Sequence, residues 1–499
     1  MSVALCLAQQ TISVGNAAGV SGGVAPGSIL SVQQQRPPQI IGPVDPSRVS
    51  VQVRPSGSTV SLDAPLLPST LLSIWAQLPA STPLGPADVT LTIDGQASAP
   101  APIVVTRTNF GLFTQAGNGL GAAIAQNQDA AVNKLTNPAL AGQYVTLWGT
   151  GLGSATSDEV RVQLGGTEIA PVYAGRAPAL TGVDQINFRI PDSGTLDGCY
   201  VSVIVKTGDI VSNEATIAKA SQPGPCEHPF GLSAMDMATL DSGGSILFGE
   251  VHLQSDGPPP PGLVPALGSS PAAAQFLPRN AFDIGLLAQP LTMDDRYFVC
   301  RSSPQLLIGG VFSFLGPIDA GALLTLTGPG RTAVLSGNGP FYDMSGNPLG
   351  MPPSDPPFLV PGTWRIEGGG GTTIGPFQAD LVLPPTVHWT NRDSLVTIDR
   401  GQDQDVTWDP TGYTDADVTA VNLSVPSSQV FCRAPATTGK LTIPSSLLET
   451  LPLGSASLRL GMGPRPNRRT LFSLPLTDGS AAQAFFDYSF SETIATQTR

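Results

Sequence analysis

Histidine is the side chain that proteins use most often for proton transfer and metal binding near neutral pH. This chain has three histidines, His228, His252 and His388. None lies in an H-E-x-x-H pair, and the sequence has no G-x-S-x-G elbow between a strand and a helix, which is where many serine hydrolases carry their nucleophile. We therefore interpret all three as structural residues, and we predict no catalytic residue, no metal ligand, no cofactor-binding residue and no cofactor.

A glycine-rich run, Gly149-x-Gly151-x-Gly153, superficially resembles a phosphate-binding loop. In dinucleotide-binding proteins such a run opens a helix within a strand–helix–strand unit. Here it is followed by Ser154 to Asp158 and then by another strand-like segment. The glycines are better explained as turn residues with positive φ.

A set of acidic residues near the C-terminal end could supply oxygen ligands to calcium, but its spacing is not that of an EF-hand loop. The two-residue step from Asp403 to Asp405 more simply places both on the solvent face of a strand. The same pair is the best available match to the two carboxylates of a glycan-acting hydrolase, which we keep as the less favoured alternative function. The full set is Asp399, Asp403, Asp405, Asp409, Asp415 and Asp417.

Tryptophans that share an exposed face could form a platform for stacking sugar rings. One tryptophan per strand region is more typical of hydrophobic cores, so we predict core positions, with a carbohydrate-binding array as the alternative. The five residues are Trp75, Trp148, Trp364, Trp389 and Trp408.

Five cysteines are present, and no pair has the C-x-x-C spacing of a zinc or redox site. If Cys6 is removed with a signal peptide, the remaining four suit two disulfides in an oxidising compartment. The sequence leaves their connectivity open. We favour Cys199–Cys226, which would fasten a strand to the start of the next linker, and Cys300–Cys432 then follows by elimination.

The composition favours a secreted β-protein over a nucleic-acid-binding one. Only 12% of the residues are charged, about half the usual share, and the formal net charge is −13. Nucleic-acid binding needs clustered basic side chains, so we predict no nucleic-acid partner. No apolar run has the length of a membrane span.

Short alternating strands joined by Gly and Pro turns recur along the chain. The offset between Gly27 and Gly142 is 142 − 27 = 115, and that between Pro79 and Pro191 is 191 − 79 = 112. Two landmarks with nearly the same offset indicate a tandem duplication of a domain of about 100 residues. That size and strand spacing predict an all-β fold of tandem immunoglobulin-like sandwiches.

We divide the chain into a truncated signal-peptide remnant and four β-domains. Met1 to Gln10 resembles the end of a signal peptide without its charged start, and the alternative is that it forms a first strand. The predicted segments are 1–15 (remnant), 16–106 (first sandwich), 107–222 (second sandwich), 223–385 (third β-domain) and 386–499 (C-terminal sandwich).

The second sandwich resembles a C-terminal domain common in uncharacterised secreted proteins of Acidobacteria, the Solibacter-type family, within the IPT/TIG branch of immunoglobulin-like folds. The matching text is Asn137-Pro138, Val145 to Gly153, Val172 to Gly175, Gly182 to Asn187, Ile190-Pro191 and Ser212-Asn213. Later motifs such as Pro361 to Trp364 and Phe431 to Ala436 extend the resemblance over most of the chain. The resemblance implies export and a sandwich fold, and it brings no activity, cofactor or catalytic residue.

Together these patterns predict a non-enzymatic extracytoplasmic protein, at the cell surface or in the periplasm. It would act in adhesion, or as a surface or interaction scaffold. Its partner would be a cell-surface protein or a polysaccharide.

Overall fold

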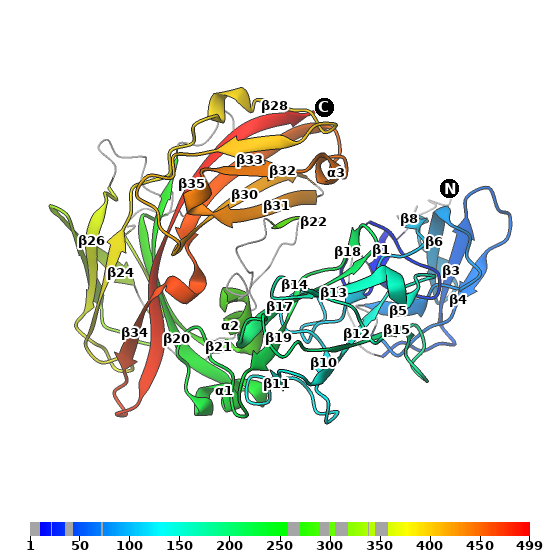
Figure 1. Cartoon of the computed structure of the whole chain (residues 1–499), viewed down its shortest axis with the longest axis horizontal. Helices are drawn as coiled ribbons and strands as arrows, with labels where there is room; N and C mark the ends of the chain where they lie inside the picture. The colour runs from blue at the N-terminus through cyan, green and yellow to red at the C-terminus, as the bar shows by residue number, and fades with distance from the viewer. Residues whose placement is uncertain are drawn as a thin grey trace, which may run out of the picture. The chain divides into compact units, whose positions relative to one another are not determined.

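The structure is a computed structural model, and the chain divides into two compact units, Met1–Cys226 and Glu227–Arg499, called unit 1 and unit 2 below (Figure 1). Strands make up 52% of the structure and helices 7%, so the predicted all-β class of tandem immunoglobulin-like sandwiches is confirmed. The residues described are 10–20, 22–34, 43–70, 73–257, 270–288, 299–304, 318–337, 339–344, 358–426 and 428–499.

The first sandwich of unit 1 packs two antiparallel sheets around one apolar cluster, which runs from Ile12 to Val105. One sheet has the order β1 (Ile12–Asn16), β2 (Ile29–Gln34) and β5 (Ile74–Gln77). The other has the order β4 (Leu62–Ala64), β3 (Val49–Pro55), β6 (Gly85–Ile93) and β7 (Gln96–Ala97), with β8 (Ala101–Val105) also paired to β6.

The second sandwich encloses a separate apolar cluster, from Phe110 to Ile217. Its first sheet has the order β10 (Ala125–Gln126), β12 (Tyr144–Thr150), β16 (Asp184–Arg189) and β15 (Tyr173–Arg176), with β9 (Gly111–Leu112) paired to β12. Its second sheet has the order β11 (Ala139–Leu140), β19 (Ala215–Ala220), β17 (Gly198–Thr207), β13 (Val160–Leu164) and β14 (Thr167–Ile169), with β18 (Ile210–Val211) paired to β17.

The two sandwiches repeat one pairing scheme. β2 pairs with β5 as β12 pairs with β16, and β3 joins β4 and β6 as β13 joins β14 and β17. β6 then pairs with β7 and β8 as β17 pairs with β18 and β19. The landmark glycines occupy equivalent places, since Gly27 and Gly142 each lie two residues before a strand start and both have φ of 78°. The strand pairing therefore supports the duplication that the sequence predicts.

Unit 2 is built around a 14-stranded sheet whose inner face encloses one large apolar cluster. The sheet order is β22 (Val299–Pro304), β31 (Ser428–Pro435), β30 (Asp417–Val425), β33 (Gly454–Pro464), β35 (Ala481–Thr498), β20 (Ser245–Asp256), β21 (Ala272–Asn280), β25 (Phe341–Asp343), β24 (Arg331–Gly337), β23 (Leu323–Gly328), β26 (Gly362–Gly368) and β27 (Phe377–Leu383). β28 (Thr397–Ile398) and β34 (Thr470–Pro475) also pair with β35, and β29 (Gln404–Thr407) pairs with β32 (Lys440–Ile443). Figure 1 shows β20 and β35 side by side through the middle of this unit.

The described residues of unit 2 include three short α-helices: α1 (Ala234–Asp241), α2 (Ala281–Ala288) and α3 (Ser445–Leu448). α1 begins where Ser233 accepts a hydrogen bond from the backbone N–H of Asp236, and the Asp236 carboxylate accepts one from the Ser233 N–H. This reciprocal cap satisfies N–H groups that the first turn of a helix leaves unpaired.

The predicted boundary between 385 and 386 does not separate two folds. β20, before that boundary, pairs in parallel with β35, after it, and Trp364 and Val421 belong to one apolar cluster. Parallel neighbours need a long crossover, and no local pattern identifies the partner of a strand so far away in sequence. The third and fourth predicted domains are therefore corrected to one.

The predicted remnant 1–15 also needs correction at its C-terminal end. Residues 1–9 lie outside the described part of the chain. Ile12–Asn16 forms β1, which pairs antiparallel with β2, and Ile12 is buried in the first core. The first sandwich therefore begins before residue 16, because Ile12 and Val14 alternate as a strand requires.

Candidate functional site

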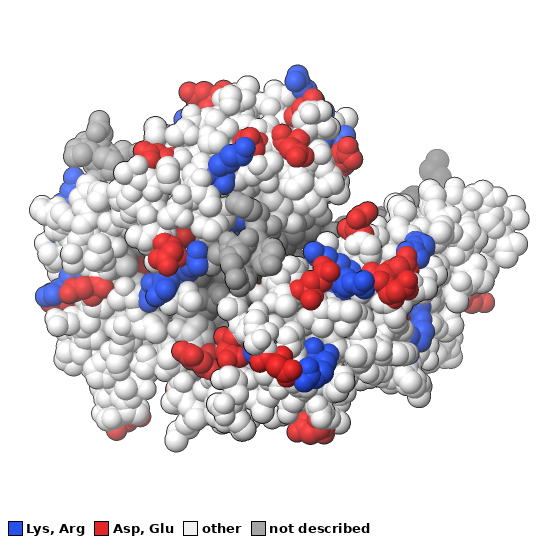
Figure 2. Space-filling view, in the orientation of Figure 1, with Lys and Arg blue, Asp and Glu red and all other residues white. Residues whose placement is uncertain are grey.

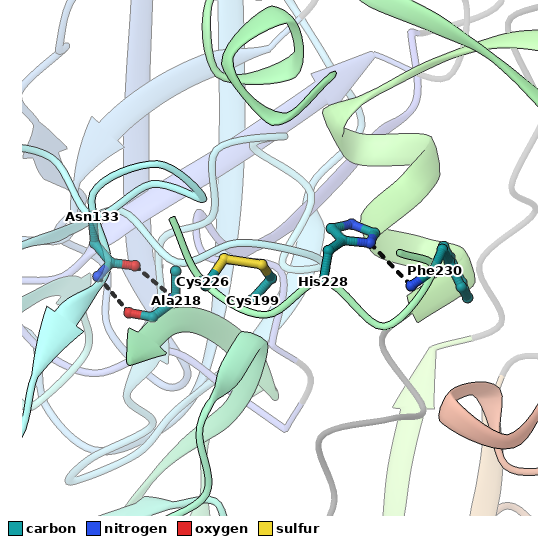
Figure 3. Close-up of a disulfide and its surroundings, with 6 residues drawn as sticks. All are labelled: Asn133, Cys199, Ala218, Cys226, His228 and Phe230. Atoms are coloured by element: carbon teal, nitrogen blue, oxygen red, sulfur yellow. Dashed lines mark hydrogen bonds between the residues drawn. A yellow bond between two sulfur atoms is a disulfide. The ribbon is translucent and has the colours of Figure 1, made fainter. Parts of the chain in front are cut away.

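Both disulfides that the sequence favoured are present, Cys199–Cys226 and Cys300–Cys432. The first joins β17 to the last residue of unit 1 (Figure 3). Beside it, the Asn133 side-chain amide pairs with the backbone of Ala218. The amide donates a hydrogen bond to the Ala218 carbonyl oxygen at 2.8 Å and accepts one from the Ala218 N–H at 2.7 Å. The second joins neighbouring strands β22 and β31.

One of the histidines predicted to be structural, His252, lies in a chain of hydrogen bonds with an aspartate and a serine. In unit 2, His252 Nδ1 is 2.5 Å from Asp487 Oδ1, and His252 Nε2 is 2.8 Å from Ser489 Oγ. Serine, histidine and aspartate occur in this order in the active sites of serine hydrolases. The sequence reasoning missed this arrangement.

The register of the central strands brings these residues together. β20 and β35 run in parallel with His252 opposite Asp487, and Ser489 lies two residues further along the same face. The available signal was a polar residue at every second position, from Glu250 to Asp256 in β20 and from Asp487 to Ser491 in β35. That pattern predicts a polar face on each strand, but it does not show that strands 235 residues apart are neighbours.

Asp487 is shared with a buried arginine. Its Oδ2 atom is 2.8 Å from Arg469 Nε, and the two side chains are 6% and 14% exposed. The Arg469 guanidinium also lies 4.3 Å from the centre of the Phe485 ring and donates to the backbone oxygen of Leu287. Burial lowers the pKa of Arg469, while the Asp487 charge opposes that shift. Asp487 therefore contacts the Arg469 guanidinium as well as the His252 ring.

This arrangement differs from a hydrolase site in the placement of its serine. A serine nucleophile lies at a sharp turn, where backbone N–H groups are available to stabilise an oxyanion. Ser489 lies inside β35, opposite Gln254 of β20, in a continuous ladder. The chain of hydrogen bonds ties two central strands together, much as Glu250 does nearby by accepting from Gln275 and Arg279.

The other two histidines occupy different surroundings. His228 is buried, accepts a hydrogen bond from the Phe230 backbone N–H at 3.1 Å (Figure 3), and burial lowers its pKa to about 3. His388 is exposed. Among the described residues, no group of three or more His, Cys, Asp or Glu side chains converges as a metal site would require.

The acidic pair Asp403 and Asp405 does not have the properties of an acid–base pair. A hydrogen bond from the Ser445 backbone lowers the pKa of Asp403. Hydrogen bonds from Lys440 and then Thr442 lower the pKa of Asp405. A general acid needs a raised pKa, so neither carboxyl is prepared to donate a proton.

Close backbone packing explains why glycines occupy the Gly149-x-Gly151-x-Gly153 run of the second sandwich. A Cβ at Gly149 or Gly151 would lie 2.2 Å from the backbone oxygen of Gly111 or Asn109. Gly151 and Gly153 have positive φ, as expected of turn residues, whereas Gly149 lies within β12. The run therefore lets the strand pass against the preceding segment, and β13 follows it after a short 3₁₀ turn.

The tryptophans are divided between cores and sheet surfaces. Trp364, Trp389 and Trp408 belong to the core of unit 2, as predicted. Trp75 and Trp148 are only half-buried, and each lies in a different sandwich of unit 1. The five do not form one shared platform.

On the face of the molecule that Figure 2 shows, charged side chains occur in small groups of both signs among mostly uncharged residues. Opposite charges pair, as in Arg48–Asp94 and Arg365–Asp380. Among the described residues, no helix is long and apolar enough to cross a lipid bilayer.

Comparison with known proteins identifies no family: no protein-family model and no curated protein matches the sequence. Several solved structures are similar over parts of the chain. A Bacteroides ovatus protein, SGBP-B of a mixed-linkage glucan utilization locus, is 15% identical over 40% of this chain and 45% of its own, with a TM-score of 0.21. Domains 5–6 of the S-layer protein SbsC are 15% identical over 43% of this chain and 98% of their own, with a TM-score of 0.19.

The Yersinia pseudotuberculosis adhesin InvE is 14% identical over 42% of this chain and 58% of its own, with a TM-score of 0.14. This chain thus spans less than two thirds of the SGBP-B and InvE chains. At these TM-scores, no statement about the function of this chain depends on the likenesses.

Proposed function

We propose that this chain is a non-enzymatic extracytoplasmic scaffold whose sheet surfaces bind a cell-surface protein or polysaccharide. The observation that carries the proposal is the pairing of all four cysteines outside the N-terminal segment into two disulfides, one in each unit. Stable disulfides are typical of oxidising compartments and rare in the cytosol. The resemblance to secreted Solibacter-type, IPT/TIG-like proteins belongs to the same proposal.

The surface chemistry supports binding over catalysis. Only 12% of the residues are charged, and the candidate carboxyl pair is held in its ionised form by local hydrogen bonds. Rigid sheet surfaces suit adhesion and surface assembly, because a rigid surface loses little conformational entropy on binding.

The test combines fractionation with disulfide mapping. Antibodies against the chain should find it in the extracytoplasmic fraction of the source cells. Non-reducing peptide mapping of that material should yield the linked peptides Cys199–Cys226 and Cys300–Cys432. A cytoplasmic protein with free thiols at these four positions would contradict the proposal.

A second candidate function, ester hydrolysis, is favoured by one observation, the Ser489–His252–Asp487 chain. In such a reaction Ser489 Oγ would attack the ester carbonyl while His252 takes its proton and passes it to the leaving alkoxide. Water would then release the acyl group from Ser489.

A fluorophosphonate probe separates the two candidates, because it labels activated serines covalently. We expect the native protein to remain unlabelled. The Ser489→Ala variant serves as the matched blank and should give the same signal. Labelling that is lost in Ser489→Ala would instead establish a hydrolase and overturn the non-enzymatic proposal.

A further inference from the structure

The outer face of the β10–β12–β16–β15 sheet in the second sandwich combines exposed aromatic rings with side-chain amides. Val145 and Leu147 of β12 point into the core, so the alternating residues on that strand point outward. Cross-strand pairing places Trp148 beside Gln185 and Gln185 beside Gly175. In the next row, Thr146 is beside Asn187 and Asn187 is beside Tyr173. We call this surface the aromatic face, made up of Tyr144, Thr146, Trp148, Tyr173, Gly175, Gln185 and Asn187.

Both central rings are held in position before any ligand arrives. The Trp148 indole N–H donates to Gln126 Oε1 at 3.2 Å, and the Gln126 amide in turn donates to the Ala130 carbonyl. The Tyr173 hydroxyl donates to the Arg176 carbonyl at 2.6 Å. The Tyr173 ring extends over Gly175, where a Cβ would come within 3.0 Å of the hydroxyl oxygen. Fixed rings reduce the entropy lost on binding.

Amide groups lie between the two rings. Gln185 Nε2 donates to Asn187 Oδ1 at 2.9 Å, which leaves the Gln185 oxygen as an acceptor and the Asn187 amino group as a donor. The backbones of Trp148 and Gly175 are two strand spacings apart, about 10 Å. The face therefore presents two apolar surfaces with polar groups between them.

The charge of the face decides what kind of chain it can bind. Arg189, at its edge, is paired with Asp192 at 2.8 Å, and the central residues are uncharged. A nucleic acid also stacks on aromatic rings, but it needs a positively charged groove to follow its backbone. An uncharged face fits an uncharged chain.

We propose that the aromatic face binds a neutral polysaccharide, with one sugar ring stacked on Trp148 and another on Tyr173. The C–H groups on the flat face of a pyranose meet the negative face of an aromatic ring, while Gln185 and Asn187 exchange hydrogen bonds with ring hydroxyls. This inference rests on the proposed role as an extracytoplasmic binding scaffold, and it names the class of ligand.

The first sandwich supplies a matched control. Its equivalent sheet, β1–β2–β5, carries Trp75 opposite Ser31 on β2, and the Trp75 indole N–H donates to Ser73. Trp75 is half-buried like Trp148. The face around Trp75 has no second aromatic residue on its three strands, so the Trp75→Ala variant should bind as the native chain does.

The experiment is affinity electrophoresis of the full chain in gels that contain hydroxyethylcellulose, arabinoxylan, galactomannan or anionic polygalacturonate. We expect retardation in at least one neutral gel. Tyr173→Ala and Trp148→Ala should each weaken that binding about tenfold or more, as loss of a stacking ring does in single-strand binders. Gln185→Ala should weaken it less, and Trp75→Ala should leave it unchanged.

Circular dichroism and thermal unfolding check each variant, and Tyr173→Ala carries the test if Trp148→Ala does not fold, because Tyr173 is 38% exposed. No retardation in any neutral gel, retardation by polygalacturonate alone, or undiminished binding by Tyr173→Ala would overturn the inference. These outcomes do not affect the disulfide mapping or the fractionation. The proposed role as an extracytoplasmic scaffold is therefore tested independently of the polysaccharide inference.

Discussion

Unit 1 and unit 2 bury similar apolar side chains by different routes. Unit 1 contains two cores, and each is formed by about 100 consecutive residues with the same strand pairing. Unit 2 has one core that collects residues from Val251 to Ile494, and its central pair, β20 and β35, joins distant segments. A repeated local design needs only short loop closures, whereas unit 2 must close long loops before its contacts form. We therefore expect unit 2 to depend more strongly on features that restrict the unfolded chain.

The largest expected difference concerns the disulfides. A disulfide limits the unfolded chain more when it closes a longer loop, and the sequence separations are 132 for Cys300–Cys432 and 27 for Cys199–Cys226. The chain-entropy relation gives about 5 kcal/mol for the first and about 3.5 kcal/mol for the second. Cys300→Ala/Cys432→Ala should therefore destabilise unit 2 more than Cys199→Ala/Cys226→Ala destabilises unit 1.

Urea unfolding followed by hydrogen-exchange mass spectrometry assigns each loss to its unit. The native protein under reducing conditions provides the control, because it should show both losses together. Equal losses of stability in the two units, or a greater loss in unit 1, would contradict the proposed contrast between local and long-range loop closure.

Buried ion pairs offer the next contrast. In unit 2, Arg469 and Asp487 are both largely buried, and breaking such a pair costs about 3 kcal/mol or more. In unit 1, Asp184 is fully buried, but the side chain of its partner Arg176 is 41% exposed. Asp184 also accepts the Leu152 N–H at 2.7 Å. Arg469→Met should therefore destabilise unit 2 by about 3 kcal/mol, and Arg176→Met should destabilise unit 1 by only about 1 kcal/mol.

Denaturant midpoints measured on the two variants test this difference. Each variant reports on its own unit, and the untouched unit serves as the internal reference. A cost for Arg176→Met equal to that for Arg469→Met would show that solvent access at the guanidinium does not matter here.

The sequence was sufficient wherever structure follows from local pattern. Alternation, turn residues and the offset from Gly27 to Gly142 predicted the class and the duplication. The single tryptophans of the later segments were correctly assigned to cores, and the disulfide Cys199–Cys226 was favoured because its cysteines flank one strand and its following linker.

Long-range pairing could not be predicted in this way. His252 and Asp487 form a pair only because β20 lies beside β35, and a two-residue polar period contains no information on which strands are neighbours. The same lack of information on which strands are neighbours produced the incorrect boundary at residue 385. Trp148 was recognised as a possible sugar contact, but its partner Tyr173 emerged only from the register of β16 with both neighbouring strands.

The next expected difference between the two units is in how their stability responds to acid. All three histidines lie in unit 2, and burial lowers the pKa of His228 to about 3 from an ordinary value of 6.5. Between those pH values the unfolded chain binds a proton that the folded chain does not, so stability falls as pH falls. Unit 2 should lose about 1.4 kcal/mol per pH unit through this group below pH 6.5.

Unit 1 should respond later, because the groups in it that lose stabilisation in acid are carboxylates such as Glu159, whose pKa is lowered to about 2 chiefly by its hydrogen bond from Arg107. Their contribution is lost only as pH falls below about 4.5. Thermal unfolding between pH 7.5 and 4.5 checks this order, with His228→Gln as the control that should flatten the slope of unit 2. A slope unchanged by His228→Gln would assign the acid sensitivity to other groups.

The smallest expected effect tests the repeat within unit 1. Gly27 and Gly142 share a φ of 78°, and an L-residue in the left-handed region costs about 1–2 kcal/mol. A Cβ at Gly27 would meet the end of the Arg176 side chain at 2.4 Å, and one at Gly142 would meet Asp192 Oδ1 at 2.9 Å. Both neighbours are side-chain ends that can move, so Gly27→Ala and Gly142→Ala should lower the urea midpoint by similar amounts. Gly15→Ala, in open space on β1 without positive φ, should change the free energy of unfolding of unit 1 by less than about 0.5 kcal/mol. A cost at only one of the two equivalent glycines would show that the copies share their strand order without sharing the turn geometry that starts each sandwich.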